Sequence, residues 1–445
     1  MGTEADQGHL QLAPESFLST DLINEVQREG IDSGRRTLLS RAIAAAVAAV
    51  AVPSVEAADD PDIVNLPSWT RSLGKPVVAN PYGQPSPFEA NIVRRQSPGL
   101  TRTDQSSVSF TPLQNLFGMI TPSGLHFERH HQGWVDIDPR RHRLMINGLV
   151  KTPLVFTMEE LLRMPSVSRI HFLECGANTG LEWGNVAVPT VQYTHGMLSA
   201  SEFTGVPVSL LLERAGIDRK RAKVLLAEGA DGSSMTRTIN LENALDDALV
   251  AYGQNGEMLR PENGYPLRLV VPGVQGVSWV KWLRRLEVGD EPWATKDEAA
   301  HYVDMMPDGT HRQYTSIQEA KSVITAPSGG QKLLKHGYYS VTGLAWSGRG
   351  TVQKVEVSVD GGRNWRPARV EGPLLPKALT RFKYDWVWQG EETLLQSRVT
   401  DSTGYVQPSR AELIGVRGTR SIYHNNAIQT WRVGSDGEVN NVQLG

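Results

Sequence analysis

Hydrophobic and polar positions alternate in short runs along most of the chain, which is the pattern expected for β-strands with one buried face. Between residues 140 and 295, turns rich in glycine, proline and asparagine separate these runs. The runs do not follow the regular rhythm of a doubly wound sheet, and no glycine-rich phosphate-binding fingerprint is present. We therefore predict a mixed α/β domain. Its expected strands are residues 142–150, 169–174, 222–228, 266–271 and 276–283.

Two short segments of this domain carry helix signals. In residues 157–164, Thr157 stands at the expected N-cap and Glu160 follows three residues later, which forms a capping box. In residues 206–216, Gly216 supplies the C-terminal stop after an apolar run. Both helices are short, so strands dominate the expected domain.

From Ile324 onward the pattern is entirely β-like, with turns such as Asp360-Gly361-Gly362 between the runs. This spacing predicts a sandwich of the immunoglobulin type, in a second domain that is structural or oligomerising rather than catalytic. The polar segment Asp297–Gln313 is expected to link the domains or to line the mouth of the site. The expected strands of the second domain are residues 338–344, 352–359, 378–388, 394–400 and 410–416.

Composition narrows the picture only modestly. A chain of 445 residues can form two or three domains, and 40% hydrophobic with 21% charged residues is ordinary for a globular protein. A net charge of -3 argues against general binding of nucleic acid or anionic membranes. The single cysteine excludes an intramolecular disulfide framework.

The N-terminal region resembles an export signal. Arg35-Arg36 precede the apolar run Ala42–Val52, and Ala57-Ala58 offer a cleavage region. The arginine pair predicts a twin-arginine signal over residues 1–58 and hence a periplasmic protein, exported folded and with no membrane span in its mature form. The run is about half of the ~20 residues that a spanning helix needs. An alanine-rich amphipathic helix with chance arginines is the alternative.

Residues 59–112 are rich in Pro, Asn, Ser and Gly, and we interpret them as an extended arm. Next comes a histidine-rich segment, with His126, His130 and His131 close to Arg129. If residues 125–131 form a strand, Arg129 and His131 share one face and point together at an anion, while His126 and His130 share the other. A zinc site and a solvated polar strand are the alternatives.

The only cysteine, Cys175, lies where an apolar run ends in a turn with Gly176, Asn178 and Gly180. A thiolate displayed at a strand end can be a nucleophile, a metal ligand or a small buried side chain. As a nucleophile it would need a close base, for which His171 and His131 are the candidates.

Several polar residues lie next to turns that contain glycine. Each of them alone would be read as an ordinary solvent-exposed side chain, but together they indicate a cleft for a large phosphate-bearing ligand. These residues are Arg129, His131, Asp231, Arg268 and Lys281.

Four separated motifs, in order along the chain, resemble the sulfite oxidase family of molybdenum enzymes, and the resemblance covers about residues 110–445. It implies an α+β fold, with a molybdopterin-binding catalytic domain over residues 113–312 and an immunoglobulin-like dimerisation domain over residues 313–445. The matching stretches are Phe127–His131, Phe172–Asn178, Tyr265–Gly273 with Val280–Trp282, and Val355–Trp365.

The resemblance implies that Cys175 is the protein thiolate on the molybdenum of one molybdopterin cofactor per chain, a soft ligand for a redox metal. It also implies that Tyr252 hydrogen-bonds near the metal, and that Arg381 reaches the substrate pocket, where Arg129 also acts. Asn263 stands where many members have a histidine, and its amide can still donate a hydrogen bond. The residues implied to hold the cofactor are Phe127, Arg129, His130, His131, Cys175, Asp231, Asn263, Arg268, Trp279, Val280 and Lys281.

One departure bears on the substrate. Members that oxidise free sulfite carry arginines just after the cysteine loop, whereas Thr179-Gly180 follow Asn178 here. Fewer cations weaken capture of a free dianion. The segments Gly133–Pro139 and Tyr423–Trp431 also resemble one branch, the molybdenum subunit of periplasmic sulfane dehydrogenase.

That branch implies a substrate carried as sulfane sulfur on a cysteine of a sulfur-carrier protein, in thiosulfate oxidation. It further implies a homodimer of this subunit within a heterotetramer that contains a c-type cytochrome subunit. No C-x-x-C-H haem motif occurs in the sequence, so we expect no haem in this chain and electron transfer to that partner. Oxidation of free sulfite, a cysteine hydrolase and a non-catalytic periplasmic adaptor are the alternatives.

Overall fold

A computed structural model describes residues 68–76, 79–96, 103–184, 188–313, 317–420 and 423–444. The predicted signal over residues 1–58 lies outside these ranges. Two compact units are distinguished, and the larger contains residues 92–336 and 340–445. The smaller contains residues 11–91 with 337–339, which begin the strand β16 (Gly337–Trp346), and its other described elements are two exposed 3₁₀ helices. These are η3 (Ser68–Arg71) and η5 (Pro87–Glu89).

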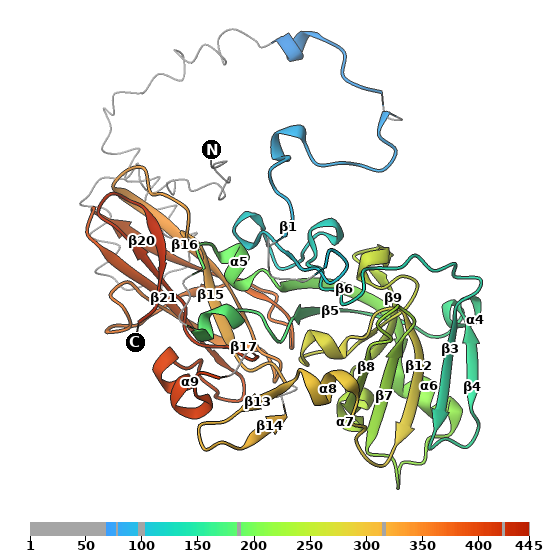
Figure 1. Cartoon of the computed structure of the whole chain (residues 1–445). Coiled ribbons are helices and arrows are strands. Elements are labelled where there is room, and N and C mark those ends of the chain that lie inside the picture. Colours follow the sequence, from blue (N-terminus) through green and yellow to red (C-terminus); the bar gives the residue numbers. More distant parts are fainter. Residues whose placement is uncertain are drawn as a thin grey trace. The chain divides into compact units, whose positions relative to one another are not determined.

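The first part of the larger unit contains two five-stranded sheets (Figure 1). One has the order β10-β9-β6-β5 with β11 paired to β9, and the other has the order β4-β3-β12-β7-β8. Every pairing is antiparallel except that of β12 with β3. The strands of the first sheet are β5 (Val167–Glu174), β6 (Leu198–Pro207), β9 (Leu249–Gln254), β10 (Glu257–Met258) and β11 (Arg268–Val270). Those of the second are β3 (Arg143–Gly148), β4 (Leu154–Thr157), β7 (Val224–Gly229), β8 (Thr236–Asn240) and β12 (Leu283–Gly289).

Short helices connect these strands, and two of them confirm the sequence signals. Thr157 and Glu160 form the expected capping box at the start of α4, and Gly216 ends α6 in the left-handed conformation at φ 71°. The helices of this part are α4 (Met158–Leu162), α5 (Val191–His195), α6 (Val208–Ala215), α7 (Leu241–Asp246) and α8 (Lys296–Ala300), with the 3₁₀ turns η6 (Leu113–Asn115), η7 (Ser123–Leu125), η8 (Gly180–Gly184), η9 (Pro261–Asn263) and η10 (Gly276–Ser278).

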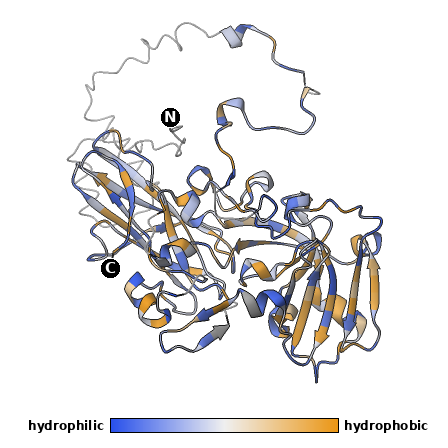
Figure 2. Cartoon of the chain, viewed as in Figure 1, coloured by the Kyte–Doolittle hydropathy of each residue, from blue (hydrophilic) through white to orange (hydrophobic). Residues whose placement is uncertain are grey.

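One hydrophobic cluster joins both sheets to α6 and α7, and it includes Leu144, Phe203, Leu211 and Leu286. Figure 2 shows hydrophobic residues concentrated along the strands of this region. Residues 92–96 and 103–112, from the predicted arm, belong to the same compact unit, where Phe110 is buried. Two short strands, β1 (Arg95–Gln96) and β2 (Ser109–Phe110), pair there.

The C-terminal part consists of two facing sheets, as expected, with the orders β15-β16-β20-β19 and β18-β17-β21-β22-β23. A hairpin, β13 (Val303–Met305) and β14 (His311–Gln313), precedes them. The strands are β15 (Lys321–Ala326), β16 (Gly337–Trp346), β17 (Val352–Ser358), β18 (Arg366–Pro367), β19 (Arg369–Val370), β20 (Thr380–Trp388), β21 (Thr393–Asp401), β22 (Thr430–Val433) and β23 (Val439–Val442).

One predicted strand of this part is wrong. Residues 410–416 form the helix α9 (Arg410–Arg417) instead. The side chain of Ser409 accepts a hydrogen bond from the backbone N–H of Glu412, and the Glu412 carboxylate accepts one from the Ser409 N–H. This capping box is a local signal for the start of a helix, and it explains why the segment is helical.

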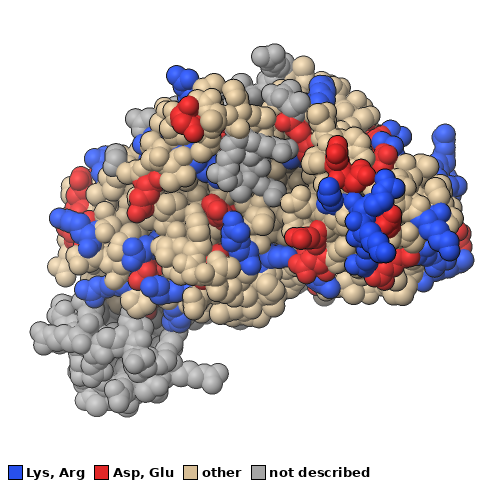
Figure 3. Space-filling model, turned by 90° about the horizontal axis from the view of Figure 1, so that it is seen from below, with Lys and Arg blue, Asp and Glu red and all other residues tan. Residues whose placement is uncertain are grey.

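None of the helices within the described ranges is long and apolar enough to span a membrane. Figure 3 shows acidic and basic side chains intermingled over the face seen from below.

Candidate active site

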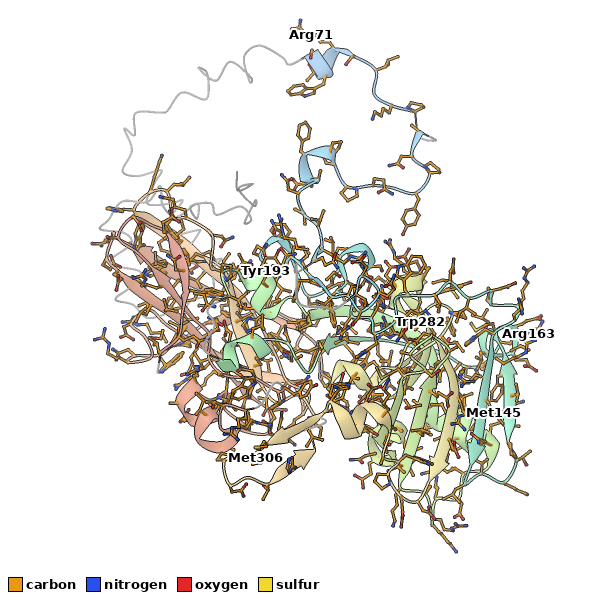
Figure 4. All side chains as sticks on the ribbon, viewed as in Figure 1. Arg71, Met145, Arg163, Tyr193, Trp282 and Met306 are labelled. Atoms are coloured by element: carbon orange, nitrogen blue, oxygen red, sulfur yellow. The ribbon has the colours of Figure 1, made fainter. Side chains whose placement is uncertain are left out.

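A cavity opens in the larger unit where the end of β5 meets the β7–β8 turn and residues 276–282. It holds about 740 Å³ of empty space, its open mouth included. Trp282, which lines it, is labelled in Figure 4. All of the residues that the family resemblance implies for cofactor binding line this one cavity. They are Phe127, Arg129, His130, His131, Cys175, Asp231, Asn263, Arg268, Trp279, Val280 and Lys281.

Cys175 stands at the exit of β5, as the sequence predicted. Leu173 and Cys175 both line the cavity, while Glu174 between them points to the opposite side. The Cys175 N–H donates to the Met197 carbonyl at 3.0 Å, and the Cys175 carbonyl accepts from the Asn178 N–H at 2.9 Å. Burial raises the pKa of the Cys175 thiol, and a backbone hydrogen bond from Ala177 opposes this rise. A thiolate there therefore needs a cation.

The histidine-rich segment is not a strand. After η7, the chain runs through residues 126–131 without regular structure, except for an isolated bridge between Val108 and Arg129. The predicted alternation of faces is therefore wrong, because His126, His130 and His131 all reach the cavity together with Arg129. Burial lowers the pKa of His126 to about 3 and that of His131 to about 4.

A zinc site finds no support in the part of the chain that the structure describes, which contains no group of three or more His, Cys, Asp or Glu placed to hold a metal ion. A single thiolate, Cys175, is what the cavity offers to a metal, so a metal bound there needs most of its ligands from a cofactor.

Two of the three Lys and Arg side chains that line the cavity have lowered pKa values. Burial lowers the pKa of Arg268 to about 9 and, together with the nearby Arg268 charge, lowers that of Lys281 to about 7. Lys281 Nζ donates to the carbonyls of Arg129 and Glu262 at 3.3 and 3.1 Å. Such lysine and arginine side chains are unfavourable in an empty apolar site and favourable beside an anion.

Several buried polar atoms of this cavity have no hydrogen-bond partner within the protein. Among them are two donors, Asn263 Nδ2 and Arg268 Nε, and one acceptor, Asp231 Oδ1. Buried polar groups are almost always paired, so these atoms indicate a polar ligand with both donors and acceptors. A pterin ring with a phosphate is such a ligand, and the residues present fit it.

The structure does not bring Tyr252 and Arg381 to this cavity. Tyr252, on β9, packs against the hydrophobic core. Arg381, on β20, donates from Nε to the Gly118 carbonyl and from Nη2 to the Leu116 carbonyl, both at 2.9 Å. This arginine therefore anchors a loop of the first domain with its guanidinium.

The tyrosine that lines the cavity is Tyr302, which sequence reasoning missed. It lies in the segment 297–313 that the sequence expected at the mouth of the site. Its ring stacks on Tyr423 at 4.8 Å between centroids, and the Arg237 guanidinium lies 4.7 Å from the Tyr302 centroid. The pKa values of both tyrosines are raised, by burial first and then by the charge of Cys175, and that of Tyr423 reaches about 12.

Two family models match the chain. Residues 131–296 match the oxidoreductase molybdopterin-binding domain, and residues 312–431 match the Mo-co oxidoreductase dimerisation domain. Among solved structures, the chain is similar to the sulfane dehydrogenase SoxCD from Paracoccus pantotrophus, with 49% identity and a TM-score of 0.85. The match covers 87% of this chain and 99% of that chain.

Curated relatives include NADH nitrate reductases of plants. The chain is 32% identical over 319 residues to that of Solanum lycopersicum and 33% identical over 314 residues to one of Arabidopsis thaliana. Both matches cover 62% of this chain and 34% of the relative, so the chain spans about a third of the length of these curated relatives.

Proposed function

The chain belongs to the sulfite oxidase family of molybdenum oxidoreductases, and on this premise we propose that it is the molybdenum subunit of a periplasmic sulfane dehydrogenase. Its substrate is sulfane sulfur held on a cysteine of a carrier protein. The observation that carries the proposal is the 49% identity to a sulfane dehydrogenase across 99% of that chain.

The cysteine loop supports the same substrate. Thr179 and Gly180 do not line the cavity. Thr179 Oγ1 instead donates to the Asn425 carbonyl at 2.9 Å and accepts from Lys321 Nζ at 3.0 Å. The loop therefore directs no guanidinium at the metal position. A dianion entering a dry pocket needs several charge-assisted contacts, whereas a tethered, less charged sulfur chain needs fewer.

Within this proposal, Cys175 holds the molybdenum, and Arg268 with Lys281 balance the charge of the pterin phosphate. When bound, the molybdenum supplies the two-electron redox chemistry. The amide of Asn263 and the carboxylate of Asp231 hold the pterin through the buried atoms that lack protein partners. Arg129 and Tyr302, which line the same cavity, orient the substrate sulfur and stabilise negative charge as its oxygens appear.

Electrons then leave to a c-type cytochrome subunit, which we propose as the SoxD-like partner of a heterotetramer built on a homodimer of this chain. Its immunoglobulin-like domain supplies the surface for that dimer. We also propose that the protein reaches the periplasm by the twin-arginine route, through the signal expected over residues 1–58. N-terminal sequencing of the exported protein tests the route, because a mature chain that begins at Met1 contradicts it.

The decisive experiment isolates the native complex from its own periplasm and identifies what co-elutes. Steady-state assays then compare carrier-bound sulfane with free sulfite, with a cytochrome as the electron acceptor. We expect turnover of the carrier-bound sulfane. Efficient oxidation of free sulfite without activity on the carrier would instead make the chain a sulfite:cytochrome c oxidoreductase. This second candidate function is favoured by Arg129, a cation that lines the same cavity as Cys175.

A further inference from the structure

A buried ammonium group lies directly behind the cysteine loop, on the side away from the cavity. Lys321, at the start of β15 in the second domain, is only 2% exposed at its side chain, and its partner Glu174 is 4% exposed. Lys321 Nζ lies 2.9 Å from Glu174 Oε1 and 3.0 Å from Thr179 Oγ1. One cation thus contacts the residue just before Cys175 and the residue just after Asn178.

Both oxygens of the Glu174 carboxylate accept hydrogen bonds, and the donors come from both domains. Its Oε1 also accepts from Asn178 Nδ2 at 2.9 Å, and its Oε2 accepts from Trp346 Nε1 of β16 at 2.8 Å. A carboxylate buried this deeply stays charged only when cations and donors surround it. The position and rotation of Glu174 are therefore set by the second domain through Lys321 and Trp346.

The rotation of Glu174 matters because β5 is a strand. Side chains of successive strand residues point to opposite faces, so anchoring Glu174 on one face directs Leu173 and Cys175 to the other. The loop itself is closed by Asn178, whose N–H donates to the Cys175 carbonyl and whose Oδ1 accepts from the Met197 N–H at 3.2 Å.

The C-terminal segment holds the same loop from a second side. The His424 N–H donates to the Gly176 carbonyl at 2.9 Å, and Asn425 Nδ2 donates to the Thr179 carbonyl at 3.3 Å. Both contacts restrain the backbone of the loop, at Gly176 and at Thr179, and neither involves the side chain of Cys175.

We propose that Lys321 is a positioning residue for Cys175: by joining Glu174 to Thr179 it fixes the loop between them, so that the second domain sets the direction of the thiol into the cavity. The second domain then has a part in the active site besides assembly. The inference deepens the proposed function, since it concerns the residue that we assign to the metal.

The test uses the full chain prepared without cofactor, so that its outcome is independent of the metal chemistry. Amide hydrogen exchange is measured for peptides that contain residues 173–180 and for peptides from β7 and β12. The variants are Lys321→Met, the pair Glu174→Gln with Lys321→Met, and Lys332→Met as the matched control. Lys332 forms an exposed ion pair with Glu438 at 2.8 Å in the same domain.

We expect exchange of the cysteine-loop peptide to become at least about tenfold faster in Lys321→Met, with β7 and β12 unchanged, because local opening then requires less free energy. The double variant leaves no uncompensated buried charge, so it folds even where the single variant does not. It should still show the fast loop, since the contact from Lys321 to Thr179 is lost.

A loop that exchanges at the wild-type rate in the double variant overturns the proposal, as does a uniform rise in exchange across all peptides. Molybdenum analysis of wild-type protein purified from the periplasm is a separate measurement. Wild-type protein without molybdenum would contradict the proposed function. The positioning role of Lys321 would still be decided by the hydrogen-exchange data alone.

Discussion

Lys281 and His130 lie side by side in the cavity, with 2.8 Å between Nζ and Nδ1. His130 Nε2 lies 2.8 Å from Glu128 Oε2, and Glu128 in turn pairs with Arg94. Burial lowers the pKa of His130, so its ring is neutral at pH 7, with Nδ1 accepting from Lys281 and Nε2–H donating to Glu128. A chain of four polar side chains thus leads from Arg94 to the Lys281 ammonium.

The lysine at the end of this chain gives a prediction about pH. In the cofactor-free protein, burial lowers the pKa of Lys281 from 10.5 to about 7. Between these values the unfolded chain binds a proton that the folded chain lacks, so the contribution of Lys281 to stability rises with pH from about 7 and is smallest below it. Urea unfolding at pH 6, 7.5 and 9 should show that the unfolding free energy of wild type increases relative to that of Lys281→Met as the pH rises. The slope of this difference against pH should approach the uptake of about one proton on unfolding.

The exposed Lys332 supplies the control, because Lys332→Met should show no such pH-dependent difference from wild type. An equal difference in unfolding free energy between wild type and Lys281→Met at all three pH values would mean that the pKa of Lys281 is not lowered in the folded protein.

Replacement of Cys175, the proposed metal ligand, separates metal binding from folding. Cys175→Ser should lower molybdenum from about one atom per chain to background, because a neutral hydroxyl is a poor substitute for a thiolate. The unfolding free energy should change by only about 1 kcal/mol, since serine is nearly isosteric. Elemental analysis and chemical unfolding check the two expectations. Full molybdenum occupancy in Cys175→Ser would exclude Cys175 as the ligand.

A variant of Arg268 tests whether the buried polar atoms without protein partners bind a cofactor. Arg268 Nε has no partner within the protein, and burial lowers the pKa of this guanidinium to about 9. We expect Arg268→Met to lose pterin content while gaining thermal stability in the cofactor-free form, because a buried cation whose main protein contacts are a carbonyl and two aromatic rings is removed. Fluorescence of the oxidised pterin and thermal unfolding measure both. Arg221→Met, at an exposed ion pair with Asp290, should change neither.

The two candidate tyrosines are separated by paired variants. Tyr302 lines the cavity and Tyr252 packs on the core. Tyr302→Phe should lower kcat/KM by at least about tenfold, because it removes a hydroxyl near the reacting atoms. Tyr252→Phe should stay within about twofold of wild type. The reverse order in steady-state kinetics would restore the residue that the sequence resemblance favoured.

Arg381 should act on stability rather than on substrate binding. Arg381→Met removes two hydrogen bonds from a guanidinium to the carbonyls of Leu116 and Gly118, which should cost roughly 1–3 kcal/mol of unfolding free energy. The KM for substrate should not change. A large rise in KM with unchanged stability would show that Arg381 reaches the substrate after all.

Local signals explain which features could be predicted from the sequence. The capping box of Thr157 with Glu160 and the left-handed Gly216 act within a few residues, so the neighbouring sequence suffices to predict them. The same kind of signal, Ser409 with Glu412, begins α9, although residues 410–416 were expected to form a strand. The residues expected to hold the cofactor came from short motifs that resemble those of a known family, and they all line one cavity, while their roles stay a prediction.

By itself, the sequence determined the residue types of the site, the strand-to-turn context of Cys175 and the succession of an α/β part and a β-sandwich. Only the tertiary structure decided that Tyr302 rather than Tyr252 faces the cavity, and that Lys321 contacts Glu174 across 147 positions of the chain. The reason is physical. Turns and caps depend on hydrogen bonds between near neighbours, whereas the partner of a buried charge is chosen by the packing of the whole fold.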